Sequence, residues 1–345
     1  MTSAAKIVDV ALASLKPRQK EVLEARFGLA KEDEEQGETL AAIGDRLKVT
    51  RERVRQIESS GITLAKANVL KSSDATAFLD KVKKYLATRG GAARKSDVLQ
   101  YAATLAKGVR ESQLDFLATV SGAFKVYHED DDFVPFYYAG DKELKETKAF
   151  VEGWVNFLNA HKEKILGGTY ATQLASFVKT KAVGDAVAEN YLSVAKYIHK
   201  NPYGDMGLRD WAEIQPTTVR DKIYLVLKKH GEPLHFEDIA RHINKVNFDE
   251  QEALAPTVHN ELIKDDRFVL VGRGMYGLRE HGYEPGTARE VIAKVLASAG
   301  PLRPTDVVTH VNKQRFFKPN TILINLQNRS FFERLPDGRY RIREA

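Results

Sequence analysis

Apolar positions near the N-terminus recur at helical spacing and are interrupted once, which predicts two short helices joined by a tight turn. The first helix covers residues 39–47 and carries Leu40, Ile43 and Leu47 on one side. A three-residue connection follows, and its last residue, Thr50, is suited to cap a second helix that starts at Arg51. The pattern therefore predicts a helix-turn-helix.

The second helix has two different faces. Val54 and Ile57 share the face that can pack on the first helix, and Gly44 fits the crossing where the two backbones come close. The opposite face suits the DNA major groove, where Arg can pair with guanine, Gln with adenine and Glu with cytosine. An ordinary solvated helix face is the alternative, which the two-helix context disfavours. The predicted DNA-contacting residues are Arg51, Glu52, Arg53, Arg55, Gln56 and Ser59.

Another unit repeats in the second half of the chain, with a period of roughly 65 to 70 residues. Residues 221–244 and 289–312 share the order of a helix, a glycine stop, a Pro-Leu turn and a second helix. A third helical stretch follows each of them. Alternating segments broken at glycine then come at 267–280 and 331–344, and these predict β-hairpins. Three helices closed by a hairpin make a winged helix.

Fainter copies of this unit lie upstream. Residues 77–103 repeat the helix, glycine stop and second helix, and residues 124–139 can supply the hairpin. For residues 145–215, a degenerate winged helix and a long helical linker both remain open. We therefore expect a mainly α fold with small β-hairpin wings, in which an N-terminal helix-turn-helix and a linker near residues 71–76 precede an array of winged-helix-like modules. The expected domains are residues 1–72, 74–140, 145–215, 217–281 and 283–345.

Composition describes an ordinary globular chain, with 345 residues, 43% hydrophobic residues and no cysteine. The lack of cysteine excludes disulfides and thiolate metal sites, and no apolar run approaches the length of a membrane span. The net charge of +6 permits nucleic-acid binding. We expect a cytoplasmic, nucleoid-associated protein with no membrane contact.

Charge is concentrated in the last module. Residues 283–345 hold 11 Lys and Arg against six Asp and Glu, whereas residues 217–281 hold ten against 11. The last module is therefore a candidate DNA binder, and its neighbour is not drawn to DNA by charge. Three basic residues lie near the third helix and three alternate along the last strand, which places those three on one face. The possible DNA backbone contacts are Lys313, Arg315, Lys318, Arg339, Arg341 and Arg343.

Aromatic residues interleave with these basic ones, and such a pattern can stack nucleic-acid bases. Core packing is the simpler interpretation of most of them. The residues concerned are Phe316, Phe317, Phe331 and Phe332.

No constellation indicates an enzyme, a metal site or a cofactor. The nine histidines are scattered, and the closest pair, His230 and His235, misses a common helical face. The acidic run at 130–132 lies between aromatic segments and is more economically a solvated turn. The short glycine segment at 272–274 belongs to a wing rather than to a phosphate-binding loop.

Two stretches of the N-terminal module resemble a known family. LKPRQKEVLEARFGL at 15–29, followed by VTRERVRQIE at 49–58, is similar to region 4 of housekeeping-type (sigma-70 family) sigma factors, over about residues 12–70. The resemblance implies that the second stretch reads the −35 promoter element, with Arg51, Glu52, Arg55 and Gln56 at the base- and backbone-contacting positions, and that residues 15–29 help engage the β flap of RNA polymerase. An acidic insert at 31–38 separates the two stretches. After Glu58 the chain departs from the family, which has a basic helical tail there.

The module at 217–281 resembles the HARE-type helix-turn-helix domain, which is shared with the N-terminal domain of the RNA polymerase δ subunit. PLHFEDIARHI and LIKDDRFVLVGRGMYGLREHGY carry the similarity. The resemblance implies that Phe268, Tyr276 and Leu278 close a core and that Gly274 permits the turn of the wing. The acidic balance favours a protein-facing role for this module.

These features lead us to expect a transcription regulator that binds double-stranded promoter DNA and RNA polymerase. No segment resembles the promoter-melting region of a sigma factor, so we expect modulation of initiation rather than initiation itself. One alternative is an interaction protein that binds polymerase or a sigma factor with little sequence-specific DNA recognition. Another is a DNA-targeting module of a restriction or defence system, which the lack of a nuclease constellation weakens.

Overall fold

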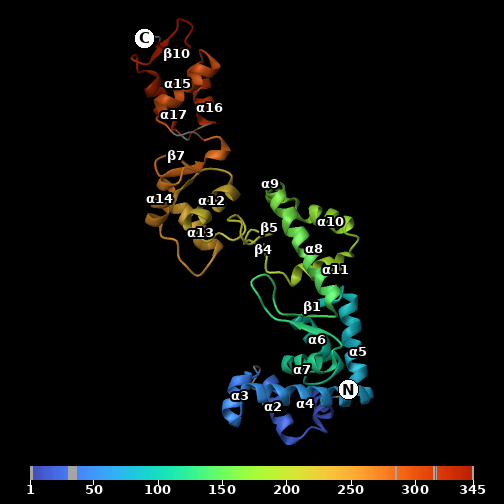
Figure 1. The fold of residues 1–345 in the computed structure, drawn as a ribbon. Coiled ribbons are helices and arrows are strands. Elements are labelled where there is room, and N and C mark those ends of the chain that lie inside the picture. The colour runs from blue at the N-terminus through green and yellow to red at the C-terminus, as the bar shows by residue number, and fades with distance from the viewer. Residues whose placement is uncertain (1–2, 30–36, 284–285, 314, 316, 344–345) are drawn as a thin grey trace. The chain divides into compact units, whose positions relative to one another are not determined.

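The chain is mainly helical with small antiparallel strand pairs, as the sequence predicts, and it divides into two units. The computed structural model describes residues 3–29, 37–283, 286–313, 315 and 317–343 (Figure 1). The first unit holds residues 1–199 and 206–209, and the second holds residues 200–205 and 210–345. Most of the acidic insert expected at 31–38 lies outside the described residues.

The predicted helix-turn-helix is present at the start of the first unit. Helices α1 (Ala4–Leu12) and α2 (Pro17–Phe27) precede α3 (Leu40–Leu47) and α4 (Arg51–Lys71). Thr50 caps α4 as expected, because its hydroxyl oxygen accepts a hydrogen bond from the Arg53 amide at 3.2 Å. Helix α4, the second helix of the helix-turn-helix and hereafter the candidate recognition helix, thus begins at the predicted residue and runs for 21 residues.

The linker expected near residues 71–76 is not present. Only Ser72 separates α4 from α5 (Ser73–Thr88). The Ser72 hydroxyl caps α5 by accepting from the Ala75 amide at 3.3 Å. Apolar side chains continue at helical spacing on both sides of this junction, and they are buried: Ala65, Val69, Ala75 and Phe78. Burial of this apolar face holds the two helices in one body, although the local sequence is rich in serine.

Three modules of the chain share an order of three helices followed by an antiparallel strand pair. In the first unit, α5 is followed by β1 (Ala92–Arg94), α6 (Lys95–Leu105), α7 (Glu111–Ser121), β2 (Lys125–Tyr127) and β3 (Phe136–Tyr138). The sheet order is β1-β3-β2, and all its pairs are antiparallel. The predicted hairpin at 124–139 is therefore confirmed.

The same sheet order appears once in the second unit, and a last copy there has an isolated Leu302–Tyr340 bridge in place of the first strand. Helices α12 (Val219–His230), α13 (Phe236–Val246) and α14 (Ala255–Lys264) accompany β6 (Leu234–His235), β7 (Phe268–Gly272) and β8 (Met275–Leu278), in the sheet order β6-β8-β7. A 3₁₀ turn, η2 (Arg279–His281), ends this copy. The last copy has α15 (Ala288–Ala299), α16 (Pro304–Asn312), α17 (Pro319–Leu326), β9 (Phe332–Arg334) and β10 (Tyr340–Ile342). Both predicted C-terminal hairpins are confirmed.

The architectural residues expected in the 217–281 module occupy the expected places. Phe268, Tyr276 and Leu278 lie in its core with at most 6% of their surface exposed. Gly274 has a φ of +66°, and a Cβ there would approach the His235 ring to 2.4 Å. Only glycine fits this turn without displacing the ring.

Residues 145–215, for which two folds were open, form helices followed by a short strand pair. The elements are α8 (Asp141–Ala160), α9 (Lys162–Lys164), η1 (Ile165–Thr169), α10 (Tyr170–Thr180), α11 (Asp185–Ser193), β4 (Ile198–Lys200) and β5 (Met206–Leu208). Helix α11 is anchored to the turn between α5 and β1, because the Asn190 amide donates to the carbonyls of Arg89 and Ala92. Gly90 has a φ of +79° there, and a Cβ would lie 2.3 Å from Val187.

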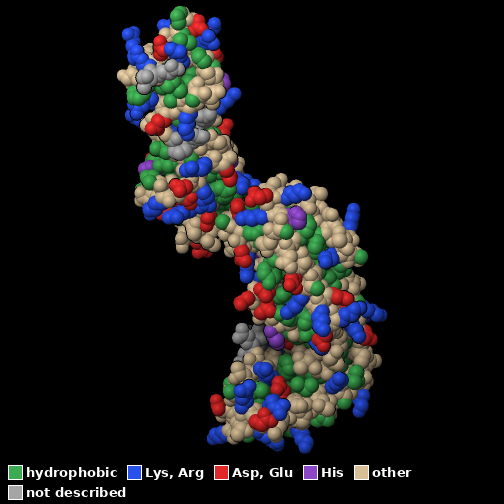
Figure 2. All heavy atoms as spheres, turned by 45° about the horizontal axis from the view of Figure 1, so that its top comes forward, with side chains coloured by type: hydrophobic (Ala, Val, Ile, Leu, Met, Phe, Trp, Pro, Cys, Tyr) green, Lys and Arg blue, Asp and Glu red, His purple; other side chains and the backbone are tan. Residues whose placement is uncertain are grey.

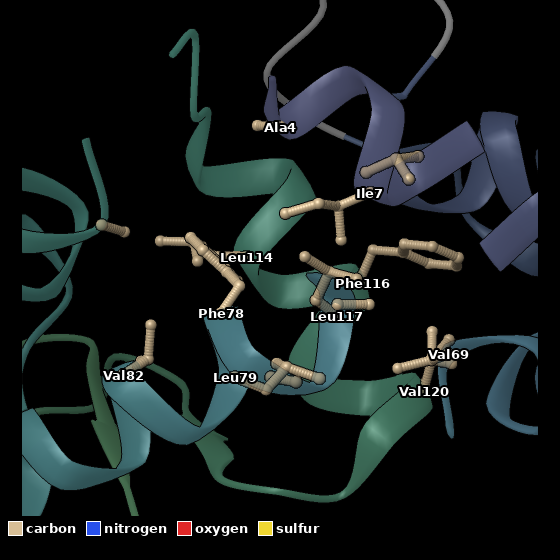
Figure 3. Packing of buried hydrophobic residues seen from close by; sticks show 14 of the residues in the cluster. Ala4, Ile7, Val69, Phe78, Leu79, Val82, Leu114, Phe116, Leu117 and Val120 are labelled. Atoms are coloured by element: carbon tan, nitrogen blue, oxygen red, sulfur yellow. The ribbon is translucent and has the colours of Figure 1, made fainter. Parts of the chain in front are cut away.

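One hydrophobic core joins the helix-turn-helix to the module that follows it. Side chains from α1, α4, α5 and α7 converge in this core (Figure 3). Phe116 of α7 is fully buried and meets the Phe27 ring of α2 edge-on at a centroid distance of 5.3 Å. The Arg110 guanidinium adds a hydrogen bond to the Leu29 carbonyl at 3.0 Å. The third helix of this winged-helix-like module therefore supports the N-terminal helices.

We predict that Phe116→Ala destabilises α4 and α5 together, by about 3 to 5 kcal/mol, because its cavity opens in their common core. Native-state hydrogen exchange of the amides in both helices measures this effect. Leu70→Ala, at a side chain that is 61% exposed on α4, serves as the control and should cost less than about 0.5 kcal/mol. Destabilisation confined to α6 and α7 would contradict a shared core.

Candidate nucleic-acid interface

The crossing of α3 and α4 fixes the orientation of the recognition helix. Val54 of α4 is buried with Ile43 of α3 and Val22 of α2, and Ile57 and Leu47 pack around them as predicted. A Cβ on Gly44 would lie 2.8 Å from the Val49 carbonyl oxygen, so the backbones are as close as the sequence suggests.

The predicted contact residues are all exposed on α4. At 100° per residue, Glu52, Gln56 and Ser59 point directly away from the buried side of the helix. Arg51 and Arg55 lie on one flank of this polar strip. Arg53 lies on the opposite flank. With arginines on both flanks, the helix can reach both walls of a DNA groove.

Two of these side chains hold each other in the free protein. The Arg55 guanidinium donates to both oxygens of Glu52, at 2.8 and 2.7 Å. This hydrogen bonding lowers the pKa of the Glu52 carboxyl and raises that of Arg55. Both side chains are about 60% exposed, so the pair contributes little to stability and can be exchanged for contacts to bases. Arg53 donates to the Gln56 amide oxygen at 3.1 Å.

Ion pairs hold the helices together behind this face, and the sequence did not predict them. Arg46 of α3 bonds Glu38 and Glu21, each at 3.1 Å. Hydrogen bonding with Glu38 is the largest cause that raises the pKa of Arg46. Arg26 of α2 bonds Glu58 of α4 at 3.2 Å. Most of these contacts join residues more than 20 positions apart, which local patterns cannot indicate.

Three of the predicted arginines of the last module alternate as expected. Arg341 lies in β10, with Arg339 and Arg343 just before and just after that strand, and all three are exposed. Their guanidinium groups already have partners: Asp337 for Arg339, Glu333 for Arg341 and the Arg329 carbonyl for Arg343. Lys313 and Lys318 are exposed at either side of the segment before α17.

Arg315 does not have the exposed position that its predicted contact with the DNA backbone requires. Its side chain is only 6% exposed, and it donates to the Gly286 carbonyl at 2.5 Å. The guanidinium also lies over the Phe317 ring, and burial lowers its pKa. Arg315 therefore ties Gly286 to the segment before α17 instead of facing solvent. A spacing pattern does not distinguish an inward arginine from an outward one.

The aromatic residues near these arginines mostly serve packing. Phe332 is buried, Phe317 packs against the same core and Phe331 is 42% exposed beneath the Arg289 guanidinium. Phe316 lies outside the described residues.

A hollow of about 590 Å³ opens beside the last strand pair. Arg329, Arg334 and Arg343 line it, and the sequence interpretation missed the first two as ligand-facing residues. Its one carboxylate among the described lining residues, Glu333, is paired with Arg341. The lining therefore favours an anion such as a DNA phosphate.

The 217–281 module presents a different surface. Leu254, Ile263 and Leu270 are 58, 65 and 47% exposed. Acidic groups nearby are paired internally, for example Glu261 with Lys264 and Asp265 with Arg267.

Figure 2 shows Lys and Arg mixed with Asp and Glu over most of the drawn face, so charge alone does not define one binding surface.

Comparison with protein families identifies two segments of the chain. Residues 11–63 match the family model of sigma-70 region 4. Residues 217–281 match that of the HARE-HTH domain, a helix-turn-helix domain whose description includes restriction endonucleases. Both resemblances noted in the sequence are therefore confirmed. Neither family is enzymatic.

The similar curated proteins are sigma factors. The chain is 53% identical over 55 residues to the RNA polymerase sigma factor RpoD of Helicobacter pylori, in two strains, which covers 16% of this chain and 8% of that protein. It is also 53% identical over 53 residues to the RNA polymerase sigma-B factor of Nostoc sp., which covers 15% of each. The chain thus matches less than a sixth of the length of these relatives.

Among the residues that the structure describes, no helix combines the length and apolar character that crossing a membrane requires. The same residues hold no group of three or more His, Cys, Asp or Glu placed to bind a metal ion.

We predict that Gly44→Ala lowers both the melting temperature and the affinity for duplex DNA. Alanine normally stabilises a helix by about 1 kcal/mol over glycine, but overpacking against the Val49 carbonyl costs about 1 to 3 kcal/mol. Gly167→Ala is the control, because a Cβ there meets nothing within 4 Å. An unchanged melting temperature with unchanged DNA binding would contradict the close crossing.

Proposed function

We propose that the protein is a transcription regulator that recognises −35-like promoter DNA through α4 and contacts RNA polymerase. The observation that carries this proposal is the exposed polar face of α4, set on a braced helix-turn-helix within a segment that matches sigma-70 region 4. In the bound state Arg51 and Arg55 approach guanines, Gln56 approaches adenine and Glu52 accepts from cytosine. Arg53 and Ser59 lie at the margins of this contact.

The last module adds contacts to the DNA backbone. Lys313, Lys318, Arg339, Arg341 and Arg343 are exposed, and a phosphate oxygen can replace a surface carboxylate as the partner of an arginine. Two modules that bind one duplex raise the overall affinity if their separation matches the sites. Because both modules would bind DNA, we infer that the protein associates with the nucleoid.

We assign the contact with polymerase, including contact with the β flap, to the outward side of α2. The apolar side of α2, with Leu23 and Phe27, is already covered within the first unit by α4 and α7. Lys16, Arg18 and Lys20 are exposed along the first turn of α2, where Arg18 pairs with Glu21 at 3.2 Å and Lys20 with Glu24 at 3.8 Å. We infer that a polymerase surface with acidic groups meets these residues.

The second candidate function is an interaction protein that binds polymerase or a sigma factor with little sequence-specific DNA recognition. The exposed Leu254, Ile263 and Leu270 of the 217–281 module favour it, because apolar contacts are typical of protein partners. Under this alternative, the face of α4 would be a docking surface.

We predict that Arg55→Ala weakens binding to a −35-containing duplex by about 1 to 3 kcal/mol and leaves binding to a scrambled duplex nearly unchanged. Lys66→Ala is the matched control, because it removes one exposed charge from the same helix. This control should change binding to both duplexes equally. Fluorescence anisotropy at several salt concentrations measures each affinity.

An equal loss of affinity for both duplexes in Arg55→Ala would assign Arg55 to a phosphate instead of a base. Wild-type protein that copurifies with polymerase but shows no salt-dependent binding to promoter fragments would decide for the interaction protein.

A further inference from the structure

The winged-helix-like module that follows the helix-turn-helix contains a basic stretch. Residues 81–96 hold six Lys and Arg and no Asp or Glu. The stretch covers the second half of α5, the turn at Gly90 and Gly91, and the start of α6. A run of this length with basic but no acidic residues requires a physical explanation.

Two of the six residues have internal roles. Arg94 donates to the Ser193 carbonyl of α11. Lys95 is buried and bonds Asp115 at 2.7 Å and Glu111 at 2.9 Å. Burial opposes the charged form of Lys95, but these hydrogen bonds outweigh it and raise its pKa. Neither side chain is available to a ligand.

The other four are exposed: Lys81, Lys83, Lys84 and Arg89. The three lysine ammonium groups form no hydrogen bond or ion pair with any residue in the described ranges. Other exposed lysines of the first unit do pair, such as Lys125 with Asp141 and Lys142 with Glu146. Lys81 and Lys84 lie on the side of α5 opposite its buried residues Val82 and Leu86.

Arg89 is held at the end of this row by a column of aromatic rings. Its guanidinium lies 5.2 Å from the centroid of the Tyr85 ring. Tyr85 in turn stacks on Tyr101 of α6, with centroids 4.3 Å apart and planes 10° from parallel. A guanidinium stacked in this way keeps its N–H groups free for a phosphate and loses little side-chain freedom on binding.

The surroundings favour a phosphate backbone over a protein. Protein interfaces have an apolar centre with few charged residues, and lysine is depleted there. No large apolar side chain is exposed among the residues of α5.

We propose that Lys81, Lys84 and Arg89 form a second DNA-binding surface, which holds the sugar–phosphate backbone of duplex DNA without reading sequence. This surface rests on the proposed function in that DNA is the ligand, but it does not depend on recognition by α4. The core shared by α4 and α5 keeps it in one body with the recognition helix. From Arg55 to Lys71, α4 runs about 24 Å. The basic surface therefore extends the contact beyond the −35-like site.

The test compares two triple variants of the full chain. Lys81→Gln/Lys84→Gln/Arg89→Gln removes the proposed surface, and Lys142→Gln/Lys145→Gln/Lys164→Gln removes the same charge from sites elsewhere in the first unit. Affinity for a scrambled duplex is measured from about 50 to 200 mM salt, and circular dichroism melting checks the fold. Each lost phosphate contact reduces the slope of log affinity against log salt by about 0.9.

We expect the α5 variant to lose about 2 to 3 units of that slope and at least roughly tenfold in affinity at low salt. The control variant should lose less than about one unit. Equal slopes for the two variants would overturn the proposal. So would an α5 variant that keeps wild-type DNA binding but loses binding to poly-glutamate, because the surface would then serve an acidic protein.

The same measurements separate this proposal from the proposed function. Wild-type protein that does not discriminate a −35-containing duplex from a scrambled one, together with a reduced slope in the α5 variant, would refute recognition by α4 and support the basic surface. Wild-type protein that discriminates the two duplexes, together with an unchanged slope in the α5 variant, would support recognition by α4 and refute the basic surface.

Discussion

Burial of α7 against α2 and α4 is the constraint on which the first unit depends. Phe116 contributes a fully buried ring to the core that also contains Ala65 and Val69 of α4. Because of this contact, the recognition helix is fixed to the next module instead of moving on a linker. The third helix of that module, which winged helices often present to DNA, is used here as a support. The proposed binding surfaces on α4 and α5 therefore keep a constant separation.

The recognition face itself is held weakly, and that suits its proposed role. Glu52 and Arg55 pair at the surface, where water competes with the ion pair and limits its strength. The supporting pairs behind the face, such as Arg26 with Glu58, join different helices. The backbone is thus braced while the side chains that meet bases can change partners at low cost. Preorganised helices with exchangeable side chains favour specific binding.

Local pattern was sufficient for much of this structure. Helical spacing and the Thr50 cap predicted where α3 and α4 begin, and glycine-broken alternation predicted the hairpins, because both signals act over a few residues. Contacts between distant segments were not predictable: Ser72 was assigned to a linker although α4 and α5 share a core, and Arg315 was assigned to the surface although it is buried. Side-chain type and spacing do not show which neighbours cover a residue. The contact residues of α4 are exposed as expected, and their role in DNA binding stays a prediction.

Recognition of −35-like DNA by α4 is the central claim, and genome-wide occupancy with and without the Arg51 and Arg55 side chains tests it most directly. The account predicts that peaks of the wild-type protein align with promoter −35 positions and that Arg51→Ala/Arg55→Ala loses this alignment while general DNA association through α5 and the last module persists. Wild-type peaks unrelated to −35 positions, or the same alignment in the variant, would contradict the claim.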